Sequence, residues 1–193
     1  MMSVEFMEMR WFLEDQEKDV LLEMIADKPS YLRYIANPTE DMCLASVRKE
    51  SLVLQAIDQT EEICIEAVSM NGLLLKYVKE QTEEICFKAV RQDGLALRFV
   101  ENQTEDMVIE AVKQNGEALR YVEDQTEEIC LIAVKQNPDA LRYVKNQTEE
   151  ICLIAVNACT VHTLGYVKDQ TEEICAIAVE KRYDALRFVL PKY

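Results

Sequence analysis

Apolar and polar positions recur along this chain with a period of about 22 residues. The clearest copy runs from Thr126 to Gln147 and reads TEEICLIAVKQNPDALRYVKNQ. In it, a threonine and two acids precede an apolar run, 129–134, and a second apolar cluster follows at 140–144. A fixed period in the twenties is typical of stacked arrays whose units contact their neighbours along the chain. The pattern therefore predicts a solenoid.

Equivalent threonines begin seven copies, at Thr39, Thr60, Thr82, Thr104, Thr126, Thr148 and Thr171. A degenerate copy without the threonine begins at Glu17, which makes eight repeats. The expected repeats are 17–38, 39–59, 60–81, 82–103, 104–125, 126–147, 148–170 and 171–193. Residues 1–16 resemble the end of a repeat and are predicted to form an N-terminal capping segment. Because no linker or composition break follows, we expect one solenoid domain over residues 17–193.

Each repeat is predicted to contain two short helices. Thr126 is a good N-cap, and the two acids after it suit the positive first turn. Asn137-Pro138, replaced by Asn-Gly or Asp-Gly in other copies, indicates the start of a second helix. The apolar run could by itself be a buried strand, but no alternating pattern appears and helix-forming residues dominate the rest. We therefore expect an all-α fold, an α-solenoid of about eight 22-residue helix-turn-helix repeats. Helices of roughly eight to ten residues are too short to be stable alone and must stack.

Six of the seven cysteines occupy one position of the repeat, namely Cys43, Cys64, Cys86, Cys130, Cys152 and Cys175. Neighbouring helices pack about 8 to 10 Å apart, whereas a disulfide needs Cα atoms within about 7 Å. We therefore expect free, buried thiols and a reducing, cytoplasmic compartment. A metal site is the weaker interpretation, since the chain has no Cys-x-x-Cys pair and a single histidine.

Catalytic chemistry has little support in this sequence. A Cys159/His162 nucleophile rests on proximity alone, because no orienting group or glycine-rich oxyanion loop accompanies the two residues. Phosphate-binding glycine motifs are absent, so we expect no cofactor and a non-enzymatic protein. No apolar run approaches the roughly 18 residues that a membrane span needs, and the first residues do not resemble a signal peptide. These features predict no membrane association.

Charge is the strongest functional signal, because 21 basic and 36 acidic residues give a net charge of −15. Seven repeats start with an acidic pair, and stacking would align the pairs as an acidic stripe that includes Glu61, Glu62, Glu83, Glu84, Glu105, Asp106, Glu127, Glu128, Glu149, Glu150, Glu172 and Glu173. A thinner basic row follows the second helices, at Arg33, Lys76, Arg98, Arg120, Arg142 and Arg187. Acids at helix starts and bases near helix ends complement helix dipoles, which explains both rows without a ligand.

Direct binding of nucleic acid or of an anionic membrane is disfavoured, since phosphate contacts need clustered Lys and Arg. The acidic stripe suggests an alternative function, a nucleic-acid mimic that blocks a DNA- or RNA-binding protein. Its charge is dilute for that role, at about one per 5 Å along a stack of about 10 Å repeats, against about one per 1.7 Å in duplex DNA.

Variation between copies indicates a protein partner. The seventh position of the repeat carries Ile132, Ile154 and Ile177 in the last three copies, where earlier copies carry mostly charged residues. These isoleucines are either core residues of a rotated helix or an apolar contact strip. Together with Phe188 and Leu190 at the uncapped end, they suggest partner binding or a homodimer formed through the C-terminal repeats. The glutamine before each threonine, as at Gln125, is predicted to be structural and to satisfy backbone groups of the connection.

The unit TEEICLIAVKQNPDALRYV resembles the repeat called domain of unknown function 4116 (DUF4116), a family of short helical repeats from large DNA viruses and associated microbes. The resemblance covers Glu17 to Val189 and rests on the Thr-Glu-Glu start, the Ala-Val-x-x-Asn-Gly middle and the Leu-Arg-Tyr-Val end. It implies the helical fold and a host- or partner-interaction context, and it brings no catalytic residues. We therefore expect a non-enzymatic, acidic protein-interaction scaffold or inhibitor in a viral or host-directed setting.

Overall fold

All regular secondary structure in the described part of the chain is helical, as the repeat pattern predicts. The computed structural model describes residues 4–158 and 162–190, and 73% of it is helix with no strand among these residues. It separates into two compact units, Met1–Gln92 and Asp93–Tyr193. The fold-class prediction of an α-solenoid with units of about 22 residues is confirmed. The single domain over 17–193 stays a prediction, and each unit is described by itself.

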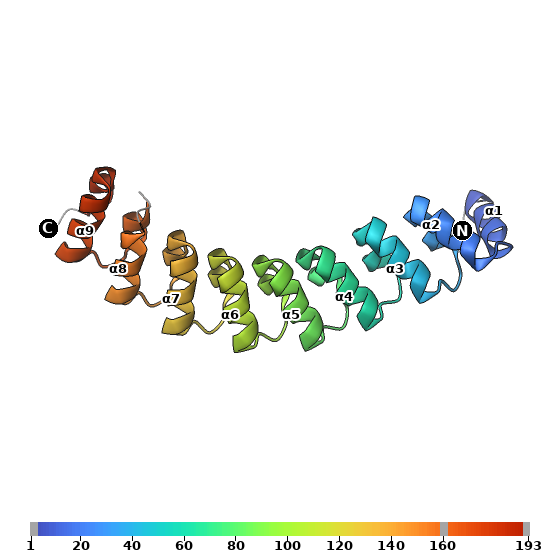
Figure 1. The fold of residues 1–193 in the computed structure, drawn as a ribbon, viewed down its shortest axis with the longest axis horizontal. Coiled ribbons are helices and arrows are strands. Elements are labelled where there is room, and N and C mark those ends of the chain that lie inside the picture. Colours follow the sequence, from blue (N-terminus) through green and yellow to red (C-terminus); the bar gives the residue numbers. More distant parts are fainter. Residues whose placement is uncertain (1–3, 159–161, 191–193) are drawn as a thin grey trace. The chain divides into compact units, whose positions relative to one another are not determined.

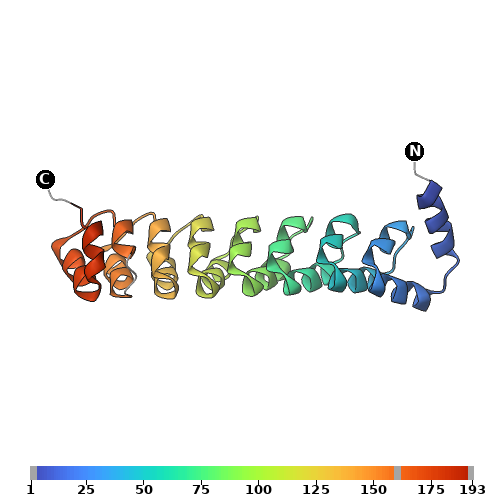
Figure 2. The same ribbon diagram turned by 90° about the horizontal axis from the view of Figure 1, so that it is seen from above.

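Each repeat consists of one α-helix and one 3-10 helix, labelled η. The first unit contains α1 (Val4–Glu14), α2 (Lys18–Asp27), η1 (Pro29–Tyr34), α3 (Glu40–Lys49), η2 (Ser51–Ala56), α4 (Glu61–Met70), η3 (Gly72–Tyr77) and α5 (Glu83–Gln92). The second contains η4 (Gly94–Phe99), α6 (Glu105–Gln114), η5 (Gly116–Tyr121), α7 (Glu127–Gln136), η6 (Pro138–Tyr143), α8 (Glu149–Asn157), η7 (Thr163–Tyr166), α9 (Glu172–Lys181) and η8 (Tyr183–Phe188). Within each unit, successive repeats lie side by side in chain order (Figure 1; Figure 2).

The repeated threonines cap the α-helices, as predicted. Thr126 Oγ1 accepts a hydrogen bond from the backbone N–H of Ile129 at 3.3 Å, and five other threonines make the same contact, namely Thr60, Thr82, Thr104, Thr148 and Thr171. Thr39 is the exception, because its side chain makes no capping bond. A capping oxygen satisfies one of the free N–H groups of the first turn, so each copy starts its helix by the same local chemistry.

The second element of the repeat is shorter and tighter than predicted. Instead of an α-helix of eight to ten residues, it is a 3-10 helix of six residues, four in η7. Asn137 starts η6, because its side-chain oxygen accepts the N–H of Asp139 at 3.0 Å. The other end is closed by a glutamine of the preceding connection, since Gln125 Nε2 donates to Tyr143 O at 3.1 Å and Gln125 Oε1 accepts Lys145 N–H at 2.9 Å. With these groups satisfied by a side chain, the backbone leaves the helix after Tyr143.

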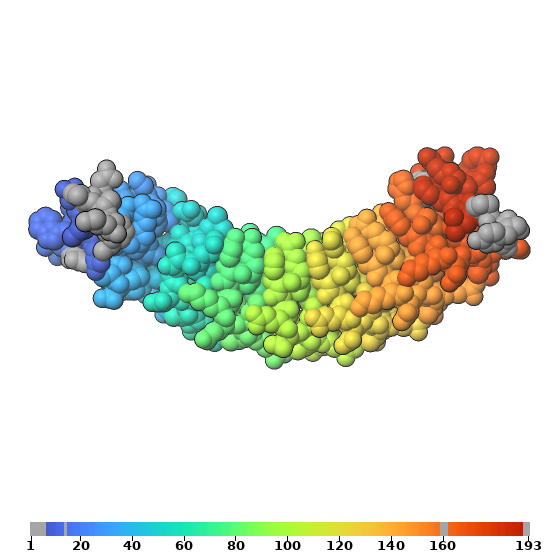
Figure 3. All heavy atoms as spheres, turned by 180° about the vertical axis from the view of Figure 1, so that it is seen from behind, coloured from blue at the N-terminus to red at the C-terminus, as the bar shows by residue number. Residues whose placement is uncertain are grey.

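The core of each unit lies between the α layer and the 3-10 layer. In the repeat that begins at Thr126, Ile129, Cys130, Ala133 and Val134 of α7 are buried, together with Ala140 and Leu141 of η6. The same positions are buried in the neighbouring repeats, and Figure 3 shows successive repeats of each unit in direct contact. Stacking therefore buries apolar faces that no single repeat could bury alone.

The N-terminal segment forms an α-helix, α1, rather than a 3-10 helix. Leu13 is buried, whereas Trp11 is 78% exposed and Phe12 is 50% exposed. The echo of a repeat end in residues 1–16 therefore does not extend to its secondary structure. Its role as a cap stays a prediction.

Candidate interaction surfaces

The acidic pairs lie in the first turns of the α-helices, where both members of each pair are exposed. In the first unit, the first acid of a pair also links neighbouring repeats. Thr82 Oγ1 donates to Glu61 Oε1 at 2.7 Å, and Thr60 Oγ1 donates to Glu40 Oε1 at 2.5 Å. Each threonine thus caps its own helix and holds an acid of the previous one. Part of the stripe therefore has a structural explanation, while its carboxylates remain accessible to a cationic partner.

An ion pair connects the first repeat to this row. Lys18 Nζ lies 2.8 Å from Asp41 Oδ2, and both side chains are largely exposed. The hydrogen bond and the positive charge of Lys18 lower the pKa of the Asp41 carboxyl below its ordinary value. The contact illustrates that the stripe accepts a cationic side chain on its exposed side.

The predicted isoleucine strip is half-buried. Ile132, Ile154 and Ile177 lie at the same position of α7, α8 and α9, and each retains part of its surface in contact with solvent. They are thus neither full core residues nor fully exposed ones. Both interpretations of the strip fit partly, and its role in binding stays a prediction.

The last repeat presents an open apolar face at the end of the second unit. A groove of about 830 Å³ is lined by Cys175, Ala176, Val179, Leu186 and Leu190, together with polar residues of the connection 168–172. Leu186 is 50% exposed, whereas the equivalent Leu141 and Leu164 are completely buried by the repeat that follows them. The groove is therefore the surface on which a further repeat would pack.

Of the predicted end residues, Leu190 lines this groove and Phe188 does not. The ring of Phe188 instead meets the ring of His162 edge-on, with centroids 5.5 Å apart. A Cβ on Gly165 would lie 3.1 Å from Phe188 Cδ1, so a side chain at this position would require a small shift of the Phe188 ring. Cys159, the other half of the proposed nucleophile, lies outside the described residues.

The basic row is interleaved with aromatic rings, which the sequence did not indicate. Arg120 Cζ lies 4.9 Å from the ring centroid of Tyr121 and 5.5 Å from that of Tyr143 in the next repeat. Arg142 Cζ repeats the arrangement, at 4.6 Å from Tyr143 and 5.9 Å from Tyr166. Cation–π contacts of this kind hold a guanidinium group in place above its ring. We call Arg98, Arg120 and Arg142, with the rings of Phe99, Tyr121, Tyr143 and Tyr166, the arginine–aromatic row.

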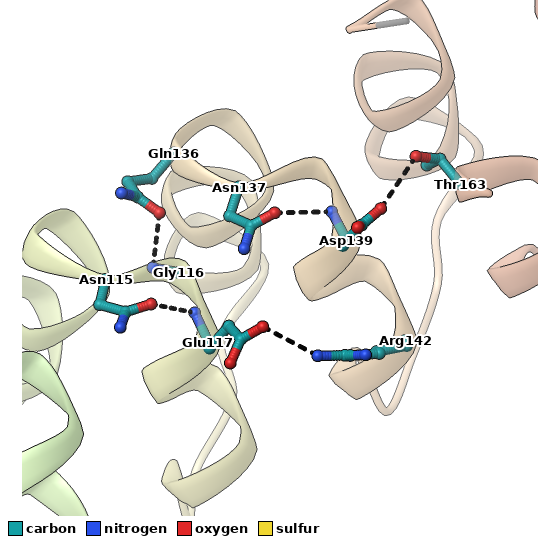
Figure 4. Close-up of polar contacts among 8 residues, drawn as sticks. All are labelled: Asn115, Gly116, Glu117, Gln136, Asn137, Asp139, Arg142 and Thr163. Carbon is teal, nitrogen blue, oxygen red and sulfur yellow. Dashed lines mark hydrogen bonds and ion pairs between the residues drawn. The ribbon is translucent and has the colours of Figure 1, made fainter. Parts of the chain in front are cut away.

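The Arg142 guanidinium also receives a carboxylate from the preceding repeat. Glu117 Oε1 lies 2.9 Å from Arg142 Nη2, so the pair connects η5 to η6 (Figure 4). Asp139, one repeat further along, instead accepts a hydrogen bond from Thr163 Oγ1 at 3.4 Å. The row thus already holds one carboxylate of the chain itself.

Two sets of glutamines form hydrogen bonds between neighbouring repeats. The first set was predicted to be structural, and its contacts confirm this: Gln147 Nε2 donates to Leu141 O at 3.1 Å and to Tyr166 O at 2.9 Å. The second set, at the C-terminal ends of the α-helices, was missed. There Gln136 Oε1 accepts Gly116 N–H at 2.6 Å (Figure 4). Gln92 and Gln114 make the same contact to Gly72 and Gly94. The sequence does contain a signal for this second set. A glutamine follows each of Gly72, Gly94 and Gly116 by twenty residues.

The six described cysteines are free thiols. Cys130 Sγ lies 3.8 Å from Gln125 Oε1, and the contact recurs along the array, at 3.3 Å between Cys86 and Gln81. Burial raises the pKa of the Cys43, Cys64, Cys130 and Cys152 thiols. A thiol kept protonated is a weak nucleophile, so these cysteines behave as small core residues.

Comparison with known proteins identifies the repeat and assigns no activity. The family described as Domain of unknown function (DUF4116) matches residues 60–104, 82–126 and 104–148, three overlapping windows that each span two repeats. No curated protein and no solved structure matches this chain. Among the described residues, no helix is long and apolar enough to cross a membrane.

Proposed function

Because the chain carries tandem repeats of the DUF4116 family over residues 60–148, we propose that it acts as a non-enzymatic scaffold or inhibitor that binds another protein. The family description assigns no activity, so the proposal rests on the surfaces of this chain. Its main support is the open face of the last repeat. There a leucine that is fully buried in the two preceding repeats is half exposed.

The lining of the groove indicates what kind of partner it suits. In the preceding repeats, the equivalent surface is covered by an α-helix and a 3-10 helix whose apolar side chains face it. A partner that offers a similar apolar helical surface would bury Leu186, Val189 and Leu190. Complete burial of such a side chain contributes about 1.5 to 3 kcal/mol, which is enough for a few residues to dominate an interface.

The test compares protein capture by the intact chain and by two variants. Leu186→Glu with Leu190→Glu places charge in the groove, while Leu52→Glu makes the same change at a leucine of similar exposure in the first unit. Each variant is checked for helix content by circular dichroism. The proposal expects a partner that is retained at high salt, lost with the groove variant and kept with Leu52→Glu. Equal capture by all three proteins would contradict it.

Two further outcomes are informative. Self-association that is removed by the groove variant, measured by sedimentation velocity, would identify the partner as a second copy of this chain. Ile154→Glu tests the isoleucine strip in the same assays, because a contact strip would lose the partner when a half-buried isoleucine becomes charged. Unchanged association with Ile154→Glu would restrict the interface to the end groove.

The alternative function is an acidic nucleic-acid mimic, and the exposure of both acids in every pair favours it. A mimic would capture a basic nucleic-acid-binding protein at low salt, release it at high salt, and compete with DNA for it. Glu127→Gln with Glu128→Gln should then weaken capture while the groove variant does not. Capture that is weakened by the groove variant and unchanged by the glutamine variant would favour the scaffold.

A further inference from the structure

The arginine–aromatic row has a geometry that dipole complementation does not require. Each guanidinium lies over a ring of the same repeat, at 4.5 Å for Arg98 and Phe99, 4.9 Å for Arg120 and Tyr121, and 4.6 Å for Arg142 and Tyr143. The three arginines are exposed, whereas the rings are half-buried. The half-buried rings therefore lie beneath the guanidinium groups, which face the solvent.

The ring contacts do not use up the hydrogen-bond donors of these arginines. A guanidinium group carries five N–H donors, and two of them can hold a carboxylate with parallel hydrogen bonds. Arg142 also makes a side-chain hydrogen bond to Tyr166. Because Arg120 and Arg142 each contact two rings from successive repeats, their orientation is fixed from both sides. The entropy cost of ordering these side chains is thus met before any partner binds.

Glu117 shows that the row accepts a carboxylate. It reaches Arg142 from the preceding repeat at 2.9 Å (Figure 4). The residue that could do the same for Arg120 is Leu95, which has no charge. In residues 4–158 and 162–190, no carboxylate oxygen lies within 4.0 Å of Arg98 or Arg120. Arg120 therefore has the two-ring setting of Arg142 without an acid, and Arg98 lies over the ring of Phe99 without an acid.

We propose that the row binds an extended acidic segment of a partner protein, with carboxylates at every third residue lying on Arg98, Arg120 and Arg142. Repeats stack about 10 Å apart. In a polyproline II segment three residues make one turn and span about 9 Å, so carboxylates at every third residue lie on one face at a matching spacing. This surface differs from the end groove and does not depend on the function proposed for it.

A carboxylate partner suits the row better than a nucleic acid. The chain has a net charge of −15, which repels the continuous charge of a phosphate backbone. An extended peptide can place isolated carboxylates on the cations and keep neutral residues between them. The one ligand already on the row, Glu117, is also a carboxylate.

The probe is a fluorescein-labelled ten-residue peptide with glutamate at every third position and neutral residues elsewhere, and binding is measured by fluorescence anisotropy with the full chain. A second peptide has the same composition with its glutamates adjacent. A single-stranded oligonucleotide of similar charge is the third ligand. We expect the spaced peptide to bind, and the clustered peptide to bind about tenfold more weakly because one register cannot reach three arginines.

Three variants locate the site. Arg98→Ala with Arg120→Ala should weaken binding of the spaced peptide by about tenfold, since each removes one ordered ion pair. Lys113→Ala with Lys135→Ala removes the same charge from exposed positions of α6 and α7 and should change binding less than about twofold. Glu117→Leu copies Leu95 of the preceding repeat, frees Arg142, and should strengthen binding severalfold.

Several results would overturn the proposal. One is that the spaced peptide shows no measurable binding or binds no more tightly than the clustered peptide. Another is that the arginine and lysine variants lose the same affinity for the spaced peptide, or that Glu117→Leu binds it more weakly. Arginine-dependent binding of the oligonucleotide with no binding of the peptide would identify the row as a nucleic-acid surface instead.

Discussion

Gln136 Oε1 accepts a hydrogen bond from the backbone N–H of Gly116 at 2.6 Å, across the boundary between two repeats. Gly116 is buried, and Gln136 supplies the acceptor for its N–H. A Cβ on Gly116 would lie 2.5 Å from Ala133 O, which explains the glycine. Where Pro138 replaces the glycine and removes the N–H, the following repeat has Ala158 in place of the glutamine. At glycines 72, 94 and 116 the donor and the acceptor thus occur together, and at Pro138 both are absent.

Replacing Gln136 by Ala should lower the free energy of unfolding by about 1 to 3 kcal/mol, because a buried N–H loses its partner. Urea unfolding followed by circular dichroism measures the change. Lys135→Ala, an exposed neighbour on the same helix, should stay within about 0.5 kcal/mol. A loss for Gln136→Ala no larger than that for Lys135→Ala would show that this hydrogen bond does not stabilise the stack.

Gln125 should contribute more to stability than an exposed glutamine. Its Nε2 donates to Leu119 O and Tyr143 O, both at 3.1 Å, and its Oε1 accepts Lys145 N–H at 2.9 Å. Gln125→Ala removes all three bonds and should cost about 2 to 4 kcal/mol of unfolding free energy. Gln55→Ala, at an exposed position of η2, is the control and should have little effect. Similar losses for the two variants would mean that water replaces the bonds of Gln125.

The buried thiols should make the array less stable at alkaline pH. Burial raises the pKa of Cys64, Cys130 and Cys152 in the folded chain. Above the ordinary thiol pKa of about 8.5, the unfolded chain loses these protons first, so the free energy of unfolding should fall as the pH rises. The fifth repeat has Val108 at the cysteine position. Changing the three cysteines to Val should therefore reduce the fall in unfolding free energy. Urea unfolding between about pH 7.5 and 10 measures it, and identical slopes for both proteins would contradict the prediction.

Thiol labelling gives an independent check. Cys175 is half-buried, whereas Cys64, Cys130 and Cys152 are buried. At pH 8, a maleimide should therefore react with Cys175 before Cys64, Cys130 and Cys152, which react only at the rate of local opening. Equal rates for all four in the folded chain would show that the stacked repeats do not protect their thiols.

The sequence by itself determined the features that depend on local chemistry repeated at a fixed spacing. The period of the threonines predicts the stacked array, and Thr126 and Asn137 predict the starts of both helices, because a capping side chain bonds to N–H groups two or three residues away. Gln125 could be recognised as structural for a similar reason. It sits in a tight connection whose backbone groups need partners.

Only the tertiary structure decided what depends on contacts between repeats. The second helix is a short 3-10 helix because Gln125, eighteen residues before Tyr143, takes the carbonyl that another turn would have used. The ion pair of Glu117 with Arg142 joins residues 25 positions apart, so no local pattern could indicate it. Burial of the isoleucine strip depends on how neighbouring helices are rotated. Local propensity does not set that rotation, because packing against the next repeat determines which face is covered.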